Sequence, residues 1–233
     1  GFLQETINDL DTMAKGLIEA TNNIYARSAT SSMQSSPLSF PPSLQLLSTN
    51  ENFKAGTFDV VMYDSEGNEA ARRTITIDQF TVMGDATIPS SIVGQTSAQF
   101  DDTGDNNALN DIDDLLLAQY NTTYNVLSLN LQPGVATQGY TFAIEDHGTN
   151  FAGVTGISRF FDGNNAKNIA VNQQIKEDPA QRHQLSYHLS ALYAADLMSE
   201  PPSPAQASPE AGSGVRSRAK SSTSMSLFLA SEM

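Results

Sequence analysis

The sequence predicts an α+β fold: an N-terminal amphipathic helix, then a mainly antiparallel β domain with short helices, then a disordered C-terminal tail. Three observations predict this fold. Apolar residues recur with a helical period near the N-terminus, they alternate as in strands from about residue 53, and Pro, Ser and Gly become frequent near the C-terminus. The predicted boundaries are 1–30 for the helix, 31–52 for a linker, 53–180 for the β-rich domain and 181–233 for the tail.

The N-terminal helix is predicted from an apolar seam with the alternating four- and three-residue spacing of a coiled coil. The seam consists of Leu3, Ile7, Leu10, Ala14, Leu17 and Ile24, with Thr21 at its one polar position. A helix of this kind is not stable alone, so its apolar face needs a partner in this chain or another. We therefore expect the seam of the helix over residues 1–30 to pack on such a partner.

The linker is predicted because residues 31–52 are rich in Ser, Thr and Pro, and because Pro41-Pro42 interrupts any helix. An antiparallel hairpin is predicted after it, around the turn "DSEGN". Its alternating apolar residues, which would share one face, are Phe58, Val60, Met62, Ile75 and Ile77.

A second strand pair is predicted around the turn at Pro133-Gly134, again from alternating apolar residues. These residues are Leu127, Leu129 and Leu131 before the turn, and Tyr140, Phe142 and Ile144 after it. Between the two hairpins, residues 108–120 are predicted to form a helix, because their leucines and isoleucine recur on one helical face.

The charge balance bears on partners. The chain has a formal net charge of −14, and residues 1–180 hold 22 acidic and 8 basic side chains. Such a surface repels nucleic acid and anionic membranes, and no apolar run is long enough to span a bilayer. The absence of cysteine excludes disulfides, zinc–thiolate sites and cysteine nucleophiles. We therefore expect neither nucleic acid nor a membrane as a partner.

Catalytic and metal sites are not predicted. The acidic stretch from Asp101 to Asp114 departs from the calcium-loop pattern, since Asn106 stands where glycine is required and Ile112 where glutamate is required. Helix capping by Asp105 and its neighbours explains these side chains better. His147 is expected to make a local hydrogen bond, and the histidines form no metal-binding motif. We predict no catalytic residue, no metal ligand and no cofactor.

The stretch "GTNFAGVTGISRFFDGNNAKNI" resembles a binding loop in composition, but no lysine follows its glycines as a phosphate-binding loop requires. A structural role is favoured. Thr149 or Asn150 would cap a short helical turn, Gly156 would end it, and Asp162-Gly163 would turn the chain toward a last short strand. The predicted core anchors of this stretch are Phe151, Phe160 and Phe161.

Several of these blocks resemble a known family. "FDVVMYDSEGNEAARRTITID", "NNALNDIDDLL" and "YTFAIEDHGTNFAGVTGISRFFDGNNAKNI" are similar to the flagellar hook-associated proteins that form the first junction between hook and filament. The helix "LQETINDLDTMAKGLIEATNNIYA" resembles the last helix of that family's rod domain. The resemblance covers about residues 1–180, and "GTNFAG", "FFDG" and "AKNI" are its most specific part.

The resemblance implies a structural, non-enzymatic subunit that is secreted through the export channel of the bacterial flagellum and assembles outside the cell, at the distal end of the hook. Its implied partners are further copies of itself, the hook protein, neighbouring hook-associated proteins and an export chaperone. The heptad-patterned segments at both ends of the family are absent, and the resemblance stops near Gln181. We therefore expect an internal fragment with an out-of-frame or foreign end, which does not polymerise alone.

Two alternatives stay open. The sheet domain also suits another flagellar axial protein, of the hook or filament type. An acidic calcium-dependent adhesion or sugar-binding module is the alternative from a different class.

Overall fold

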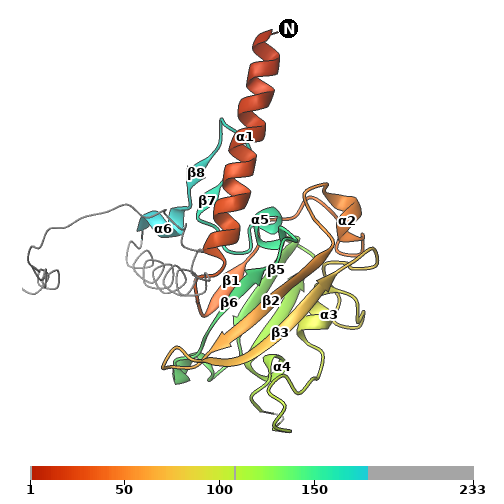
Figure 1. The fold of residues 1–233 in the computed structure, drawn as a ribbon, viewed down its shortest axis with the longest axis vertical. Helices are drawn as coiled ribbons and strands as arrows, with labels where there is room; N and C mark the ends of the chain where they lie inside the picture. The colour runs from red at the N-terminus through yellow and green to blue at the C-terminus, as the bar shows by residue number, and fades with distance from the viewer. Residues whose placement is uncertain (1, 108, 178–233) are drawn as a thin grey trace, which may run out of the picture. The chain divides into compact units, whose positions relative to one another are not determined.

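The computed structural model describes residues 2–107 and 109–177, so the predicted tail over 181–233 lies outside the described residues. The α+β fold is confirmed: a long N-terminal helix is followed by antiparallel sheets and short helices (Figure 1). The helices are α1 (Phe2–Tyr25), α2 (Leu46–Thr49), α3 (Ile92–Thr96), α4 (Ile112–Leu115), α5 (Phe151–Thr155) and α6 (Gln173–Glu177), with a 3-10 turn at Ala136–Gln138. The strands are β1 (Ser32–Gln34), β2 (Gly56–Tyr63), β3 (Glu69–Ile77), β4 (Leu116–Asn121), β5 (Val126–Leu131), β6 (Thr141–Asp146), β7 (Phe161–Asp162) and β8 (Ala170–Val171).

The first hairpin is confirmed as β2 and β3. The two strands pair antiparallel, and the apolar residues predicted to share a face are all buried. In the turn, one carboxylate oxygen of Asp64 accepts hydrogen bonds from the main-chain N–H groups of Glu66 and Asn68. Gly67 supplies the left-handed backbone, with φ of 84°. The hairpin is therefore set by local turn chemistry as well as by alternation.

The second predicted strand pair is wrong, because its two strands lie in different sheets. β6 pairs with β2 in the order β3-β2-β6, whereas β5 lies between β1 and β4 in the order β1-β5-β4. The connecting residues form a 3-10 turn instead of a tight hairpin loop. β6 thus pairs with the distant β2, whereas β5 pairs with the distant β1 and with β4, which immediately precedes it in the chain.

The predicted helix over 108–120 is mostly wrong. Only α4 is helical, and the chain continues directly as β4, which pairs with β5 along its whole length. Within β4, Leu116 and Ala118 are buried while Gln119 is exposed. A short apolar run fits a buried strand and a helix equally well, so the periodicity of this stretch did not separate the two.

The predicted linker over 31–52 is also wrong. Its residues form β1 and α2, and Met33, Leu38 and Leu46 are buried in the core. The main chain is held as well, because the Leu38 N–H donates to the carbonyl of Asn125. Serines such as Ser32, Ser39 and Ser43 occupy exposed positions beside these anchors, so the composition of a linker conceals an ordered segment.

Residues 26–35 connect the two three-stranded sheets. The Ile144 N–H donates to the carbonyl of Ala26, and Thr30 and Phe142 exchange two main-chain hydrogen bonds. One residue later, the carbonyl of Ser31 accepts from the N–H of Leu131 in β5. The chain that leaves α1 is therefore bonded first to β6 and then to β5.

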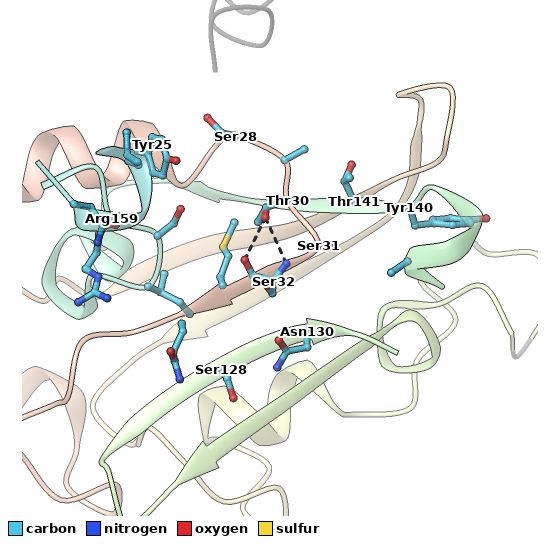
Figure 2. A pocket seen from close by; sticks show the side chains of 18 of the residues that line it. Tyr25, Ser28, Thr30, Ser31, Ser32, Ser128, Asn130, Tyr140, Thr141 and Arg159 are labelled. Carbon is cyan, nitrogen blue, oxygen red and sulfur yellow. Dashed lines mark hydrogen bonds between the residues drawn. The ribbon is translucent and has the colours of Figure 1, made fainter. Parts of the chain in front are cut away.

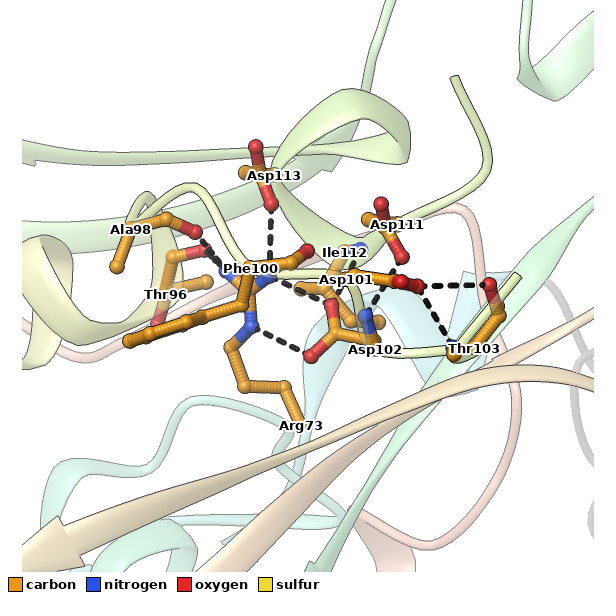
Figure 3. A network of polar contacts seen from close by, with 11 residues as sticks. Arg73, Thr96, Ala98, Phe100, Asp101, Asp102, Thr103, Asp111, Ile112 and Asp113 are labelled. Atoms are coloured by element: carbon orange, nitrogen blue, oxygen red, sulfur yellow. Dashed lines mark hydrogen bonds and ion pairs between the residues drawn. The ribbon is translucent and has the colours of Figure 1, made fainter. Parts of the chain in front are cut away.

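A buried arginine orders the long loop between α3 and α4. The side chain of Arg73 donates to both carboxylate oxygens of Asp102 and, at 2.7 Å, to Asp113 (Figure 3). It also donates to the carbonyls of Thr96 and Ala98. Burial lowers the pKa of Arg73, but the two carboxylates raise it more, so the guanidinium stays charged.

Candidate functional site: the joint between helix α1 and the sheet domain

Helix α1 contacts the domain through one narrow face. Ala14, Ile18 and Asn22 are spaced four residues apart and are all buried, while the rest of the helix is half-buried or exposed. The partners of this face are α5 and β7, which come from the stretch "GTNFAGVTGISRFFDG". We call this contact the joint; it consists of Glu19, Asn22 and Asn23 of α1 with Asn52, Asn150, Gly153, Phe160 and Phe161.

Asn22 binds the main chain of the domain with its whole amide. Its side-chain oxygen accepts from the N–H groups of Phe160, at 2.9 Å, and Phe161, at 3.0 Å. Its Nδ2 donates to the carbonyl of Phe161 at 3.1 Å. Because Asn22 is only 2% exposed, these bonds lie away from water, and an apolar residue would leave them without a partner.

Glu19 and Asn23 form the second half of the joint. The Glu19 carboxylate accepts from the side-chain amides of Asn52 and Asn150, at 2.8 Å and 2.9 Å. The Asn23 side chain accepts from the Gly153 N–H at 2.6 Å and donates to the Asn150 side chain at 2.5 Å. One polar network thereby joins α1, the loop before β2 that contains Asn52, and α5.

The short helix α5 is shaped to meet α1. The Asp146 carboxylate accepts from the N–H groups of Thr149 and Phe151, which closes the turn before it. Gly156 ends the helix with φ of 59°, as predicted from the sequence. Asn150 stands at the predicted cap position, but it takes a left-handed backbone with φ of 58° and its side chain makes no capping bond. A Cβ atom on Gly153 would lie 2.7 Å from the Glu19 carbonyl oxygen, so only glycine permits this approach.

The three predicted core phenylalanines have different environments. Phe151 is fully buried and stacks on Phe58, with ring centroids 4.3 Å apart and planes 8° apart. Phe160 and Phe161 are half-buried and lie outside the core cluster. Phe160 instead contacts Phe161 and Tyr25, both edge to face. Only Phe151 is a core anchor, and the other two belong to the joint.

The predicted seam of α1 divides into two faces. Ala14 is buried and Ile7 half-buried, on the side of the joint. The remaining seam residues are exposed: Leu3 by 74%, Leu10 by 46%, Leu17 by 53% and Ile24 by 51%, together with Met13 by 68%. Leu3, Leu10, Leu17 and Ile24 are each seven residues apart, and with Met13 we call them the exposed stripe. The domain itself therefore does not cover the stripe.

One cluster of side chains has the composition of a metal site, but its two carboxylates are bound by an arginine. Ligand atoms of Asp59, Glu145 and His147 lie within 4.8 Å of one another. The guanidinium of Arg72 donates to Asp59 at 2.8 Å and to Glu145 at 2.6 Å, and it therefore supplies the positive charge at this place. Burial raises the pKa of Asp59, but hydrogen bonds from Arg72, Thr74 and His147 outweigh this and leave it below the usual range.

Two local expectations need correction. The side chain of His147 bonds to a residue distant in sequence, because its Nε2 lies 3.1 Å from Asp59 in the neighbouring strand β2. Asp105 caps no helix: α4 begins after Asp111, whose side chain makes no capping bond. The carboxylate of Asp101 instead accepts from the N–H groups of Gly104 and Asn106, which closes the loop on itself. The carboxylate oxygens of Asp101 thus stabilise the loop through its main-chain N–H groups.

The joint residues of α1 were missed by sequence reasoning. The available signal was their spacing, because Asn22 follows Ala14 and Ile18 at four-residue intervals on a face distinct from the exposed stripe. The sequence matches no protein-family model and no curated protein. Within residues 2–107 and 109–177, no helix has the length and apolar character needed to cross a membrane.

Proposed function

We propose that the chain is a structural subunit of the bacterial flagellum, located where hook and filament meet, and that it acts by packing against neighbouring subunits. The observation that carries the proposal is the exposed stripe: α1 is fixed to the domain by one face and presents a second, heptad-spaced apolar face. A fixed helix with an unused coiled-coil face is suited to joining a larger helical array. The proposed partners are further copies, the hook protein and other hook-associated proteins.

The resemblance supports the same proposal through the joint. The blocks "GTNFAG" and "FFDG", which are the most specific part of the resemblance, supply the residues that hold α1. Glycines of these blocks allow the backbones to approach closely, and their asparagine bonds to α1. In this proposal these residues have a structural role. Export through the flagellar channel and an extracellular location follow from the resemblance and remain part of the proposal.

Binding to isolated hooks tests the proposal. The chain is incubated with purified flagellar hooks and pelleted, and the bound fraction is compared with that of a Leu10→Glu, Leu17→Glu double variant. The expected result is that the variant loses binding while its unfolding midpoint is unchanged, because both leucines are exposed. The matched control, Asn8→Glu with Thr12→Glu, adds the same charge to α1 outside the stripe and should bind as the parent chain does.

Two outcomes would contradict the proposal. The first is equal binding by the stripe variant and the parent, and the second is an absence of binding by the parent. Hooks and filaments used side by side address the alternative of another axial protein, since a filament-type subunit would bind preferentially to filament ends. A tight calcium site in titration calorimetry would favour the adhesion-module alternative instead.

A further inference from the structure

Asn121 stands in the acceptor pattern for N-linked sugars. The pattern requires Asn, then any residue except proline, then Ser or Thr, and it is met by Asn121, Thr122 and Thr123. None of the other asparagines in the sequence is followed two residues later by Ser or Thr. Because such sugars are attached on surface loops, the place of Asn121 in the fold decides whether the pattern is usable.

The fold places the pattern at the tip of the β4–β5 hairpin. Asn121 is the last residue of β4 and pairs with Val126, the first residue of β5. Asn121 is exposed, and so are the loop residues Thr122, Thr123 and Tyr124 that follow it. A transferase therefore has access to the whole acceptor pattern.

The side-chain amide of Asn121 has one group bound to the loop and one group open. Its Oδ1 accepts from the main-chain N–H groups of Thr123, at 2.9 Å, and Tyr124, at 3.1 Å. Within residues 2–107 and 109–177, its Nδ2 has no hydrogen-bond acceptor. A sugar on Nδ2 would leave both bonds of the turn in place, so attachment is compatible with the folded hairpin.

The other two asparagines of the hairpin are less accessible. Asn130 is half-buried and lies with Ser128 on the wall of a cleft of about 670 Å³ beside β1 (Figure 2). Asn125 is also half-buried, and its carbonyl accepts from the N–H of Leu38. The open amide of the hairpin is thus the one in the acceptor pattern.

Tyr124 adds a surface on which an attached sugar can pack. It is 69% exposed, and its bond to Asn121 places both residues in the same turn. The face of an aromatic ring is electron-rich and attracts the C–H groups of a sugar, and covering the ring removes apolar area from water.

We propose that Asn121 is an acceptor for an N-linked sugar, supplied as a glycosyl diphosphate. The Nδ2 atom bonds to the anomeric carbon, the bond from this carbon to the diphosphate oxygen breaks, and the diphosphate leaves with the electron pair. A base of the transferase takes up one Nδ2 proton. A nucleotide sugar and a lipid-linked sugar share this leaving group. The proposal is independent of the exposed stripe, because it uses no residue of α1.

Two transfer reactions on the folded full chain test the proposal and distinguish the donors. One contains UDP-glucose and a purified soluble N-glycosyltransferase, and the other contains a lipid-linked oligosaccharide and a purified membrane oligosaccharyltransferase. The chain should gain the mass of the transferred sugar in one or both reactions, and peptide fragmentation should place the sugar on Asn121. The reaction that proceeds identifies the donor.

Substitutions in the loop separate the acceptor pattern from the fold. Thr123→Ala keeps Asn121 but removes the required hydroxyl, so it should lower the modified fraction at least about tenfold. Thr123→Ser and Thr122→Ala both preserve the pattern and should react as the parent does. Because both positions are exposed, none of the three variants should shift the unfolding midpoint.

Four outcomes would overturn the proposal. They are no transfer in either reaction, sugar on a threonine hydroxyl in place of Asn121, equal modification of Thr123→Ala and the parent, and modification that occurs only after the chain has been unfolded.

Discussion

Gly153 is the residue at which α5 and α1 meet without room for a side chain. Because a Cβ atom there would lie 2.7 Å from the main chain of α1, we expect Gly153→Ala to destabilise the protein by about 1–3 kcal/mol. Gly16→Ala is the control, since Gly16 lies in α1 and a Cβ atom there would have nothing within 4 Å; this change should be neutral or stabilising by up to about 1 kcal/mol. Chemical denaturation measures both, and equal effects would contradict the packing argument.

Phe151 is the aromatic residue of the turn-rich stretch with the most to lose on truncation. It is fully buried against Phe58, so Phe151→Ala should cost about 3–5 kcal/mol in the free energy of unfolding. Phe160→Ala should cost clearly less, because Phe160 is half-buried. Urea denaturation of the two variants distinguishes them. A larger loss for Phe160→Ala would restore the assignment predicted from the sequence.

At the scale of elements, Asn22 connects α1 with β7. Replacing it by alanine removes the acceptor of two main-chain N–H groups, and each group left unpaired costs about 1–3 kcal/mol. We expect Asn22→Ala to lower the unfolding midpoint and to speed the exchange of the Phe160 and Phe161 amides. Asn8→Ala, on the exposed part of α1, should do neither. Unchanged exchange at Phe160 in Asn22→Ala would show that the joint does not depend on this amide.

Elements defined by local chemistry could be predicted, and elements defined by distant partners could not. The β2–β3 hairpin and the turn into α5 are encoded in contiguous residues, such as Gly67 and Asn150, and both were predicted. Both β5 and β6 bond to residues 26–35, which the sequence presented as the end of the helix and the start of a linker. The leucines of β4 fit a helix and a buried strand alike, so their state is decided by the neighbouring β5.

The sequence identified the apolar seam of α1 but not the face of α1 that contacts the domain. The apolar periodicity of α1 identified residues that remain exposed, such as Leu10 and Leu17, but it did not show which face meets the domain. That face combines the apolar Ala14 and Ile18 with polar residues such as Asn22 and Glu19, and a search for apolar periodicity passes over the polar members. The partners of these polar residues are main-chain groups and asparagines, which leave no hydrophobic pattern in the sequence.

At the scale of the whole molecule, stability should depend on pH through the carboxylates bound to Arg72. The pKa values of Asp59 and Glu69 lie below their usual range in the folded protein, so their contribution is present above the unfolded pKa of about 4 and is lost as the pH falls through the folded value. We expect the denaturant concentration at the unfolding midpoint to decrease when the pH is lowered below about 4. The stability difference between the parent and Asp59→Asn should shrink over the same range, and a constant difference from pH 7 to about pH 3 would contradict this.

Residues 26–35 also determine how a mechanical load would pass through the molecule. A pull along α1 arrives at this stretch, which is bonded to β6 at Ala26 and Thr30 and to β5 at Ser31 and Ser35. The tension is thus divided between two sheets before any single strand can be peeled away. If the proposed role in the flagellum holds, torque received by the helix would be spread across the sheet domain through its backbone.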